Sequence, residues 1–359
     1  MTFQNFPRAH PNVAIVGATG AVGVELIRCL ETRAFPLSRL KLLASPRSAG
    51  RKMPFRDEIL TVDALDGASF DGVDLALFSA GAETSRAFAP RAVAAGAVVV
   101  DNSSAFRMDP ACPLVVPEVN PGALAGHRGI IANPNCVAII AAVAMAPLAH
   151  AFGLTRVQMA TYQSASGAGA AAMDELRAST EAYLADRPFA PRVLPHPYGF
   201  NLFSHNAEVD AESGYNGEEL KVIAECRRLL AAPDLPIGVT CVRVPVLRAH
   251  SIALSLEFAR PIEPDLARQV LAAAPGLRIV DDRAGNHFPM PSEAQGQDDV
   301  LVGRIRRDLS DPSGRTLALF VAGDQLLKGA ALNAVQIAEH LFAPEPLAQT
   351  RAAKLVEVA

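Results

Sequence analysis

The sequence predicts a two-domain α/β protein, in which an N-terminal parallel sheet with crossover helices precedes a second domain of mixed α+β type. Three observations predict this fold. The chain has 359 residues, and domains usually contain roughly 100 to 200. Short β-branched runs alternate with helical stretches from Asn12 to about Ala132. A long apolar segment then follows Cys136 and leads into a new strand, which indicates a change of domain.

The elements are predicted in order along the chain. Strands of the first domain are expected at VAIVG, LKLLAS, DLALFSA, AVVVD and GIIAN, and helices at VGVELIRCLETR and ETSRAFAPRAVAAG. The second domain is expected to begin with the buried helix CVAIIAAVAMAPLAHAF and the strand LTRVQMATYQ. Residues 188–217 are rich in Pro, His, Asn, Ser and Gly, which predicts a long loop and not a packed element. A helix over 217–230, strands at TCVRVPV, SIALSLEF and TLALFVA, and an amphipathic helix over 327–341 complete the prediction.

Composition excludes several classes of protein. With 33 basic and 37 acidic side chains, the chain lacks the basic surplus of a nucleic-acid or anionic-membrane binder, so we expect a small-molecule partner. The N-terminus lacks the pattern of a signal peptide, and the longest apolar run, Val137–Ala149, contains Pro147 and is too short to span a membrane. The five cysteines show no CxxC spacing, which predicts no metal site and favours the reducing cytoplasm.

A glycine-rich motif follows the first strand directly and opens the first helix. Glycines let a backbone approach a pyrophosphate, whose negative charge faces the helix N-terminus, so this position is typical of a Rossmann-type dinucleotide site. The spacing is GxxGxxG and not GxGxxG, and a tight strand-to-helix turn is the alternative interpretation. The candidate cofactor residues are Gly17, Thr19, Gly20, Ala21, Val22 and Gly23.

The second strand ends without the acidic residue that would bind the 2′-hydroxyl of NAD. The segment LLASPRSAGRK instead supplies donors suited to a 2′-phosphate, notably Ser45, Arg47 and Ser48. The sequence therefore favours NADP over NAD, with a solvated basic loop as the alternative.

Cys136 stands in NPNC, directly ahead of the apolar helix. The positive end of a helix dipole and its free backbone amides stabilise a thiolate, so this cysteine is predicted to be a nucleophile. The other four cysteines are interpreted as small buried side chains. A thiol nucleophile in a dinucleotide-binding protein suggests oxidation of an aldehyde through a thioester, or the reverse reduction of an acyl derivative. Such chemistry needs a group that transfers protons, and His250, between two predicted strands, is the candidate.

A series of motifs together resembles aspartate-β-semialdehyde dehydrogenase. They are GATGAVG, DNSSAFRM, VPEVN, NPNC, TYQSASGAG, EELK, TCVRVPVLRAH and GDQLLKGAALNAVQIAE, and they run in order from Gly17 to about Leu341. The resemblance implies reversible, phosphate-dependent conversion of L-aspartate 4-semialdehyde to L-4-aspartyl phosphate with NADP, the reductive direction serving lysine, threonine, methionine and isoleucine biosynthesis. It also implies a homodimer, or a tetramer of paired dimers.

The resemblance assigns roles residue by residue. Cys136 matches the cysteine that forms the thioester, His250 the general acid/base, and Gln163 the residue that orients the thioester. Arg243 matches the arginine that binds the substrate carboxylate, and Glu218 the partner of its ammonium group, although a surface ion pair between Glu218 and Lys221 is the alternative. Phosphate is assigned to Arg107, Lys221 and Asn135, and further cofactor contacts to Ser166, Gly167 and Gln325.

The implied domains are an NADP-binding Rossmann-type domain, residues 1–134, joined by a C-terminal helix over 327–345, and a catalytic and dimerisation domain, residues 135–326. Two positions depart from the family pattern, Val137 after the cysteine and Leu327 in GDQLLKG, and turnover is the property they put in question. Three alternatives stay open: another acyl-phosphate reductase such as N-acetyl-γ-glutamyl-phosphate reductase, a thiol hydrolase that uses Cys136 and His250, and a catalytically silent paralogue that binds the cofactor.

Overall fold

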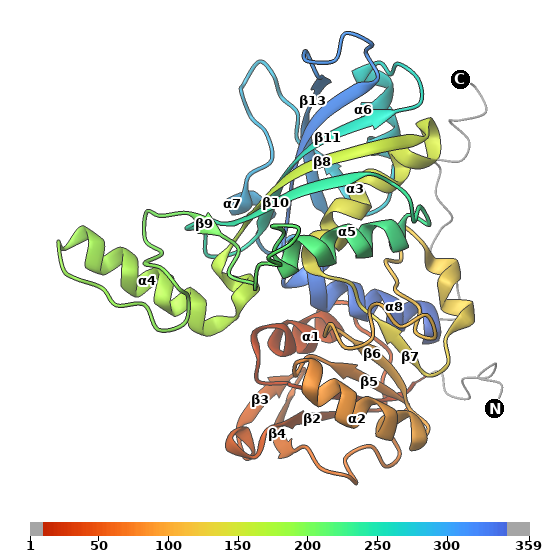
Figure 1. The fold of residues 1–359 in the computed structure, drawn as a ribbon. Coiled ribbons are helices and arrows are strands. Elements are labelled where there is room, and N and C mark those ends of the chain that lie inside the picture. The colour runs from red at the N-terminus through yellow and green to blue at the C-terminus, as the bar shows by residue number, and fades with distance from the viewer. Residues whose placement is uncertain (1–9, 343–359) are drawn as a thin grey trace. The chain divides into compact units, whose positions relative to one another are not determined.

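The computed structural model describes residues 10–342, and these fall into two compact units. The first unit contains residues 10–135 and 330–342, and the second contains residues 136–329. Each unit has its own sheet and its own helices (Figure 1). The outer parts of two predicted segments, residues 1–9 and 343–345, lie outside the described residues.

The sheet of the first unit is mostly parallel, as the alternating pattern predicted. Among the described residues its strand order is β3-β4-β2-β1-β5-β6-β7, and only β3 runs antiparallel to its neighbour β4. The strands are β1 Asn12–Val16, β2 Arg39–Ala44, β3 Lys52–Phe55, β4 Glu58–Ala64, β5 Leu75–Phe78, β6 Val98–Asp101 and β7 Ile130–Ala132. The helices are α1 Ala21–Thr32, α2 Ala82–Ala94 and α8 Leu332–Phe342, with short 3₁₀ turns at Pro46–Ser48 and Pro121–Gly126.

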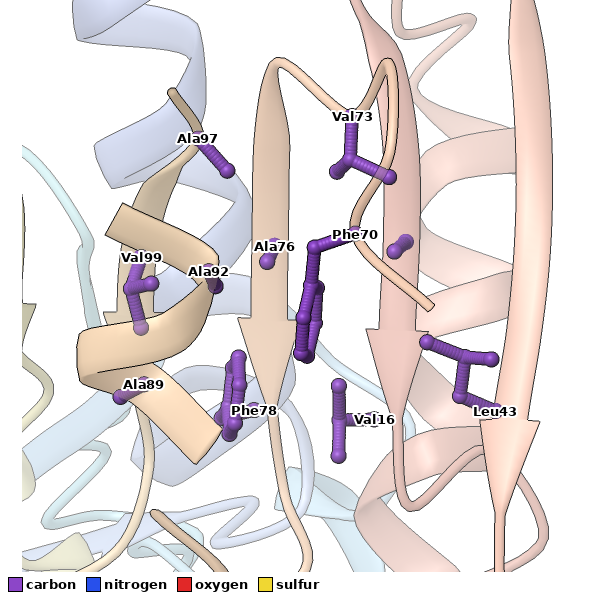
Figure 2. Close-up of a cluster of buried hydrophobic side chains, with 11 residues drawn as sticks. Val16, Leu43, Phe70, Val73, Ala76, Phe78, Ala89, Ala92, Ala97 and Val99 are labelled. Atoms are coloured by element: carbon purple, nitrogen blue, oxygen red, sulfur yellow. The ribbon is translucent and has the colours of Figure 1, made fainter. Parts of the chain in front are cut away.

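The hydrophobic core between this sheet and α2 is formed by alternate strand residues. Figure 2 shows Val16, Phe78 and Val99 on neighbouring strands, directed toward the same layer as Ala89 and Ala92 of α2. Phe70 stacks on Phe78 with ring centroids 5.8 Å apart. Small alanines on α2 allow the helix to lie close to the sheet. On α8, Glu339 forms an ion pair with Arg33, next to the end of α1, which ties the C-terminal helix to the first unit.

The second unit has a mixed sheet, in which β8 and β10 are parallel while β11 is antiparallel to β8 and β14. Its order among the described residues is β12-β13-β14-β11-β8-β10-β9. The strands are β8 Leu154–Gln163, β9 Phe203–Ser204, β10 Ile237–Arg243, β11 His250–Phe258, β12 Leu277–Ile279, β13 Val300–Arg307 and β14 Thr316–Gly323. The helices are α3 Cys136–Phe152, α4 Ala170–Leu184, α5 Gly217–Leu229, α6 Pro264–Ala273 and α7 Pro291–Ala294, with a 3₁₀ turn at Ala165–Ala168.

Helix α3 fixes the position of Cys136 in this unit. Most of its residues are fully buried, because both its sheet-facing and its outer side are covered by other elements. An apolar helix without an amphipathic pattern is typical of such a central position. Its first residue, Cys136, is therefore held at a defined place beside the sheet.

Two expectations need correction. The prediction of a long loop over residues 188–217 is confirmed, but the expectation that this segment is not packed was wrong, because Leu194, Tyr198 and Phe203 are buried in a cluster with Leu176 of α4. Apolar residues spaced irregularly in a polar loop give no periodic signal, which is why the sequence did not show this packing. The last helix also begins differently, because Leu327–Ala331 form a π-helical turn before α8.

Candidate functional site

The glycine turn after β1 is built for a close backbone approach. A Cβ on Gly17, which has φ of +90°, would lie 2.4 Å from the Ser79 carbonyl oxygen, and one on Gly23 would lie 2.2 Å from the Gly17 carbonyl oxygen. Gly20 is the N-cap of α1 and makes no side-chain capping hydrogen bond, and the first backbone N–H groups of an α-helix have no acceptor within the helix. The turn thus fits the phosphate group of a dinucleotide.

The loop after β2 lies next to this turn. The Thr19 and Ser48 hydroxyl oxygens are 3.4 Å apart, which connects the two loops at the carboxyl edge of the parallel strands. Ser45 and Arg47 are exposed. A cationic and hydroxyl-rich loop at this place suits a nucleotide that carries an additional phosphate.

The loop that leads to Cys136 is braced inside the first unit. Arg107, which is 9% exposed, donates from Nε to the Asn133 carbonyl oxygen at 3.0 Å and from Nη2 to the Asn102 carbonyl oxygen at 2.8 Å. The Asn333 amide of α8 donates to Asn133 Oδ1 at 2.6 Å. Asn135 is also buried. These backbone contacts hold the Arg107 guanidinium in place.

Cys136 differs from the other cysteines in its surroundings. It is partly exposed, whereas Cys29, Cys112, Cys226 and Cys241 are buried. Burial raises the pKa of the Cys241 thiol to about 12, so that thiol is inert at neutral pH. A Cβ on Gly329 would lie 3.0 Å from the Cβ of Cys136, so the π-helical turn covers the cysteine closely.

The structure brings Gln163 and Glu218 together. Gln163, at the end of β8, is 1% exposed and donates from Nε2 to Glu218 Oε1 at 3.1 Å. Its Oε1 accepts a hydrogen bond from the Thr161 hydroxyl at 3.1 Å. Glu218 is thus an oriented, buried carboxylate, and the alternative of a solvated surface ion pair does not describe it. Lys221 lies one turn further along α5 and is exposed.

The neighbouring Glu219 has a different role. Its Oε2 accepts from the Asn216 backbone N–H at 2.9 Å, which completes a capping box at the start of α5. Its Oε1 accepts from the Cys241 backbone N–H at 2.9 Å and so joins α5 to β10. Glu219 therefore fixes the helix that presents Glu218.

Arg243, at the end of β10, is 4% exposed and is held on three sides. It donates to the Ser164 carbonyl oxygen at 3.3 Å and to Asn206 Oδ1 at 3.3 Å, and its Nη2 lies 2.8 Å from His205 Nε2. Burial, then the charge of Arg243, lowers the pKa of His205 to about 4, so His205 is neutral near pH 7 and accepts from the guanidinium.

His250 is fully buried at the first position of β11. Its Nδ1 accepts a hydrogen bond from the Ser164 backbone N–H at 3.0 Å, while its Nε2 has no hydrogen-bond partner among the described residues. Burial first, and then the nearby Arg243 and His205, hold the pKa of His250 well below its usual value, so the imidazole is neutral.

Gly167 faces these two groups. A Cβ at this position would lie 3.0 Å from His250 Nε2 and 3.1 Å from Arg243 Nη1. We call the region next to both nitrogens, toward which a side chain at position 167 would project, the Gly167 gap. A permanent cation and an imidazole nitrogen without a hydrogen-bond partner among the described residues thus border the same region, which suits recognition of a carbonyl compound that carries a carboxylate.

Two residues assigned to the cofactor, Ser166 and Gln325, also lie in the second unit and are each 2% exposed. The Gln325 Nε2 donates to the Ser166 hydroxyl, and its Oε1 accepts from the Ala249 backbone N–H at 2.8 Å. They are therefore part of the packed site around His250. Of the two departures from the family pattern, Val137 is fully buried and Leu327 is 4% exposed, so both act through packing.

The sequence analysis did not identify Ser164, His205 or Tyr198. Ser164 stands beside Gln163 and contacts His250, His205 contacts Arg243, and the Tyr198 hydroxyl donates to the Gln163 carbonyl oxygen at 3.3 Å. His205 and Tyr198 lie in or beside the loop that was expected not to pack. The sequence signal that could have identified Ser164 was its position directly after Gln163.

Comparisons with known protein families match segments of both units of the chain. The family model "Semialdehyde dehydrogenase, NAD binding domain" matches residues 12–127, and "Semialdehyde dehydrogenase, dimerisation domain" matches residues 145–328. The aspartate-semialdehyde dehydrogenase of Synechocystis is 56% identical over 92% of this chain and 96% of its own length. That of Bacillus subtilis is 45% identical over 92% and 97% of the two chains.

Solved structures give the same result. Aspartate semialdehyde dehydrogenase II of Vibrio cholerae is 41% identical, with a TM-score of 0.89 over 94% of this chain and 100% of that chain, and a second structure of that enzyme is described as complexed with ASA. These relatives do not favour the alternative of N-acetyl-γ-glutamyl-phosphate reductase. In residues 10–342 no helix is long and apolar enough to cross a membrane, and no cluster of three or more His, Cys, Asp or Glu could hold a metal ion. The predicted relationship is confirmed, and the chain belongs to the aspartate-semialdehyde dehydrogenase family.

Proposed function

We propose that the chain catalyses the reversible, phosphate-dependent oxidation of L-aspartate 4-semialdehyde to L-4-aspartyl phosphate, and that it works in the reductive direction in amino-acid biosynthesis. The observation that carries this proposal is the Gly167 gap, where His250 Nε2 and Arg243 Nη1 border one space. A buried guanidinium and a buried carboxylate, Glu218, within one unit suit a substrate that is itself an amino acid.

In the proposed mechanism the Cys136 thiolate attacks the aldehyde carbon, supported by the N-terminus of α3. Attack forms a thiohemiacetal, and loss of a hydride from its carbon converts it to a thioester. Gln163 orients this thioester, since its amide is held between Thr161 and Glu218. Arg243 binds the substrate carboxylate, and Glu218 its ammonium group. His250 transfers protons at the substrate oxygen as general acid/base.

Phosphate is the second substrate in this proposal. Arg107, Lys221 and Asn135 are the residues that would bind it, on the strength of the family motif in which each stands. Phosphate then attacks the thioester carbon, the carbon–sulfur bond breaks, and the Cys136 thiolate is released.

We propose NADP as the cofactor, held by the glycine turn with residues Gly17–Gly23 and by Ser45, Arg47 and Ser48 after β2. The absence of a side chain at Gly17 and Gly23 and the exposed Arg47 support this assignment. When bound, the nicotinamide takes up or supplies the hydride. Ser166, Gly167 and Gln325 are proposed as the contacts made by the second unit.

The two domains have separate functions in this proposal: residues 1–134 with the helix 327–345 bind NADP, and residues 135–326 carry out catalysis and dimerisation. The match to a dimerisation domain supports a homodimer, and a tetramer would need a further interface. None of the five cysteines, all of which lie among the described residues, forms a disulfide, which supports a location in the reducing cytoplasm.

The test is NADPH formation from L-aspartate 4-semialdehyde, followed by the absorbance of the reduced nicotinamide, with and without phosphate. We expect a phosphate-dependent signal in the wild type that Cys136→Ala abolishes. Cys112→Ala, which removes a buried thiol from the first unit, is the matched control and should retain the signal. A wild type that binds NADPH and yet gives no signal with this substrate would refute the proposal.

Glu218→Gln separates this function from that of a reductase for an acetylated substrate, because an acetylated amine has no positive charge to pair with a carboxylate. Loss of a charge-assisted hydrogen bond costs about 1.5–3 kcal/mol, which corresponds to a fall in kcat/KM of roughly 10- to 100-fold. Unchanged kcat/KM for aspartate semialdehyde would contradict the assignment of Glu218.

A further inference from the structure

A continuous line of buried polar groups ends at His250. Ser164 and His250 are fully buried, and Ser166 and Gln325 are each 2% exposed. The Ser164 and Ser166 hydroxyl oxygens are 3.1 Å apart, and the Ser164 hydroxyl lies 3.0 Å from His250 Nδ1. Three of these residues come from the segment after β8 and the start of β11, and Gln325 comes from the segment after β14, so only the folded unit assembles the line.

The direction of the hydrogen bonds is determined at Gln325. The Ala249 backbone N–H can only donate, so the side-chain atom that faces it at 2.8 Å is the amide oxygen. The amide nitrogen then faces Ser166 and donates to its hydroxyl oxygen. The Ser166 hydroxyl hydrogen is left to donate to Ser164, and the Ser164 hydroxyl hydrogen to His250 Nδ1.

The other end of the line gives the same direction independently. The Ser164 backbone N–H also donates to His250 Nδ1 at 3.0 Å, so this nitrogen presents a lone pair and carries no proton. Turning the ring over would place a carbon opposite both Ser164 donors and lose both hydrogen bonds. In a neutral imidazole the single proton must then be on Nε2.

We propose that Gln325, Ser166 and Ser164 are positioning residues that hold neutral His250 as its Nε2–H tautomer, so that the resting site presents a proton donor to the Gly167 gap. The proposal rests on the function proposed above and deepens it. The charged and titratable groups that face His250 are Arg243 of β10 and His205 beside β9, and both disfavour a second proton on the ring. A substrate at the gap would meet the Nε2–H with its carbonyl oxygen and the Arg243 guanidinium with its carboxylate.

This arrangement fits the charge that the proposed reaction develops. When the Cys136 thiolate adds to the carbonyl carbon, the carbon–oxygen π electrons move to the oxygen, and the resulting oxyanion needs a donor in place. A neutral Nε2–H supplies that donor without reorganisation. An imidazole with its proton on Nδ1 would instead direct a lone pair toward the oxyanion and repel it.

The direct test is NMR of the full-length enzyme with ¹⁵N-labelled histidine, because the two ring nitrogens have distinct shifts and couplings in each tautomer. The His250 signals are assigned from their loss in His250→Gln. We expect an unprotonated Nδ1 and a protonated Nε2 from pH 6 to 8. A proton on Nδ1 in the wild type would overturn the proposal, whatever the enzyme's activity, so this outcome is independent of whether the proposed substrate is turned over.

The role of the line is tested with Ser166→Ala and Gln325→Leu, each of which frees the Ser164 hydroxyl to turn and accept a proton from Nδ1. We expect the titration midpoint of His250 to rise by about one pH unit in either variant, since one hydrogen bond no longer opposes the imidazolium. Ser251→Ala is the matched control: its buried hydroxyl is next to His250 and has no hydrogen-bond partner among the described residues.

An unchanged midpoint in Ser251→Ala together with a raised midpoint in either line variant supports the proposal. Line variants that fold, as judged by circular dichroism, and titrate like Ser251→Ala would show that Ser166 and Gln325 act only in packing or cofactor binding, and would overturn their positioning role. If one line variant fails to fold, the other decides.

Discussion

Gly167→Ala tests the central feature of the site with a single methyl group. The new Cβ would lie 3.0 Å from His250 Nε2, closer than an ordinary van der Waals contact, so it would crowd an oxygen that approaches this nitrogen to form a hydrogen bond. It would lie 3.1 Å from Arg243 Nη1, so it competes with a bound oxygen at both nitrogens. Neither neighbour can withdraw easily, because His250 is fully buried and Arg243 is only 4% exposed.

The magnitude follows from the donor that the methyl group blocks. Loss of one oxyanion-binding donor lowers kcat by about 10²- to 10³-fold in other enzymes, so we expect kcat/KM for the semialdehyde to fall by at least about 10²-fold. Gly167 has no positive φ, so its backbone conformation tolerates alanine, while the tight contacts of the new Cβ with His250 and Arg243 should lower the thermal unfolding temperature, which is measured alongside activity. Because Gly167 is also a proposed cofactor contact, the Kd for NADPH is measured separately by fluorescence titration.

The control for Gly167→Ala is Gly217→Ala in the same unit, where a Cβ meets its neighbours only at 3.7 and 3.8 Å. This control should stay within about threefold of the wild type, since it adds ordinary van der Waals contacts. If folded Gly167→Ala keeps kcat/KM within threefold of the wild type, no reacting atom uses the Gly167 gap and our reasoning about the site is refuted.

Three further predictions use other parts of the structure. Glu219→Ala should lower the free energy of unfolding, measured in urea, by about 2–4 kcal/mol, because it removes the capping box and leaves the Cys241 N–H unpaired. Glu218→Gln should instead lower activity with little effect on stability. An equal loss of stability in both variants would contradict these separate roles. His205 has a pKa of about 4 in the folded state against an ordinary value of 6.5, so between these pH values the unfolded chain binds more protons and the folded state loses stability as the pH falls. The contribution of His205 to stability should be complete above pH 6.5 and decline toward pH 4, so the thermal unfolding temperature of His205→Asn should fall less steeply over this range. Parallel curves for the variant and the wild type would exclude this contribution. Arg47→Ala should lower kcat/KM for NADP by about 10- to 100-fold and leave kcat/KM for NAD unchanged, while the control Arg39→Ala, which removes another exposed arginine, should change neither value. An equal loss for both cofactors would argue against a contact between Arg47 and the 2′-phosphate.

The fold could be predicted where the pattern along the chain is strong. β8 was expected at LTRVQMATYQ and is formed by Leu154–Gln163, and α3 was expected at the apolar segment that begins with Cys136. The hairpin β3–β4 was missed, because Lys52–Phe55 is short, contains Pro54 and lies at the sheet edge, where a hydrophobic alternation is not required. β13 was also missed: its Val300–Gly303 half is buried but its second half is charged and largely exposed, so no single period describes it.

By itself, the sequence determined the features that depend on neighbours along the chain. The glycine turn after β1 and the position of Cys136 at the start of α3 are local, because each follows from a few consecutive residues at the beginning of a helix. The motifs also showed the family, since many short segments in a constant order carry that relationship.

Only the tertiary structure decided the state and the partners of the side chains in the site. Glu218 and Glu219 are adjacent in the sequence, yet one contacts Gln163 and the other caps α5, a difference set by the register of distant strands. His250 is neutral, with its Nδ1 held by Ser164, because residues far along the chain bury it and place donors around it. Burial and hydrogen-bond direction arise from long-range packing, and a linear sequence has no local signal for either.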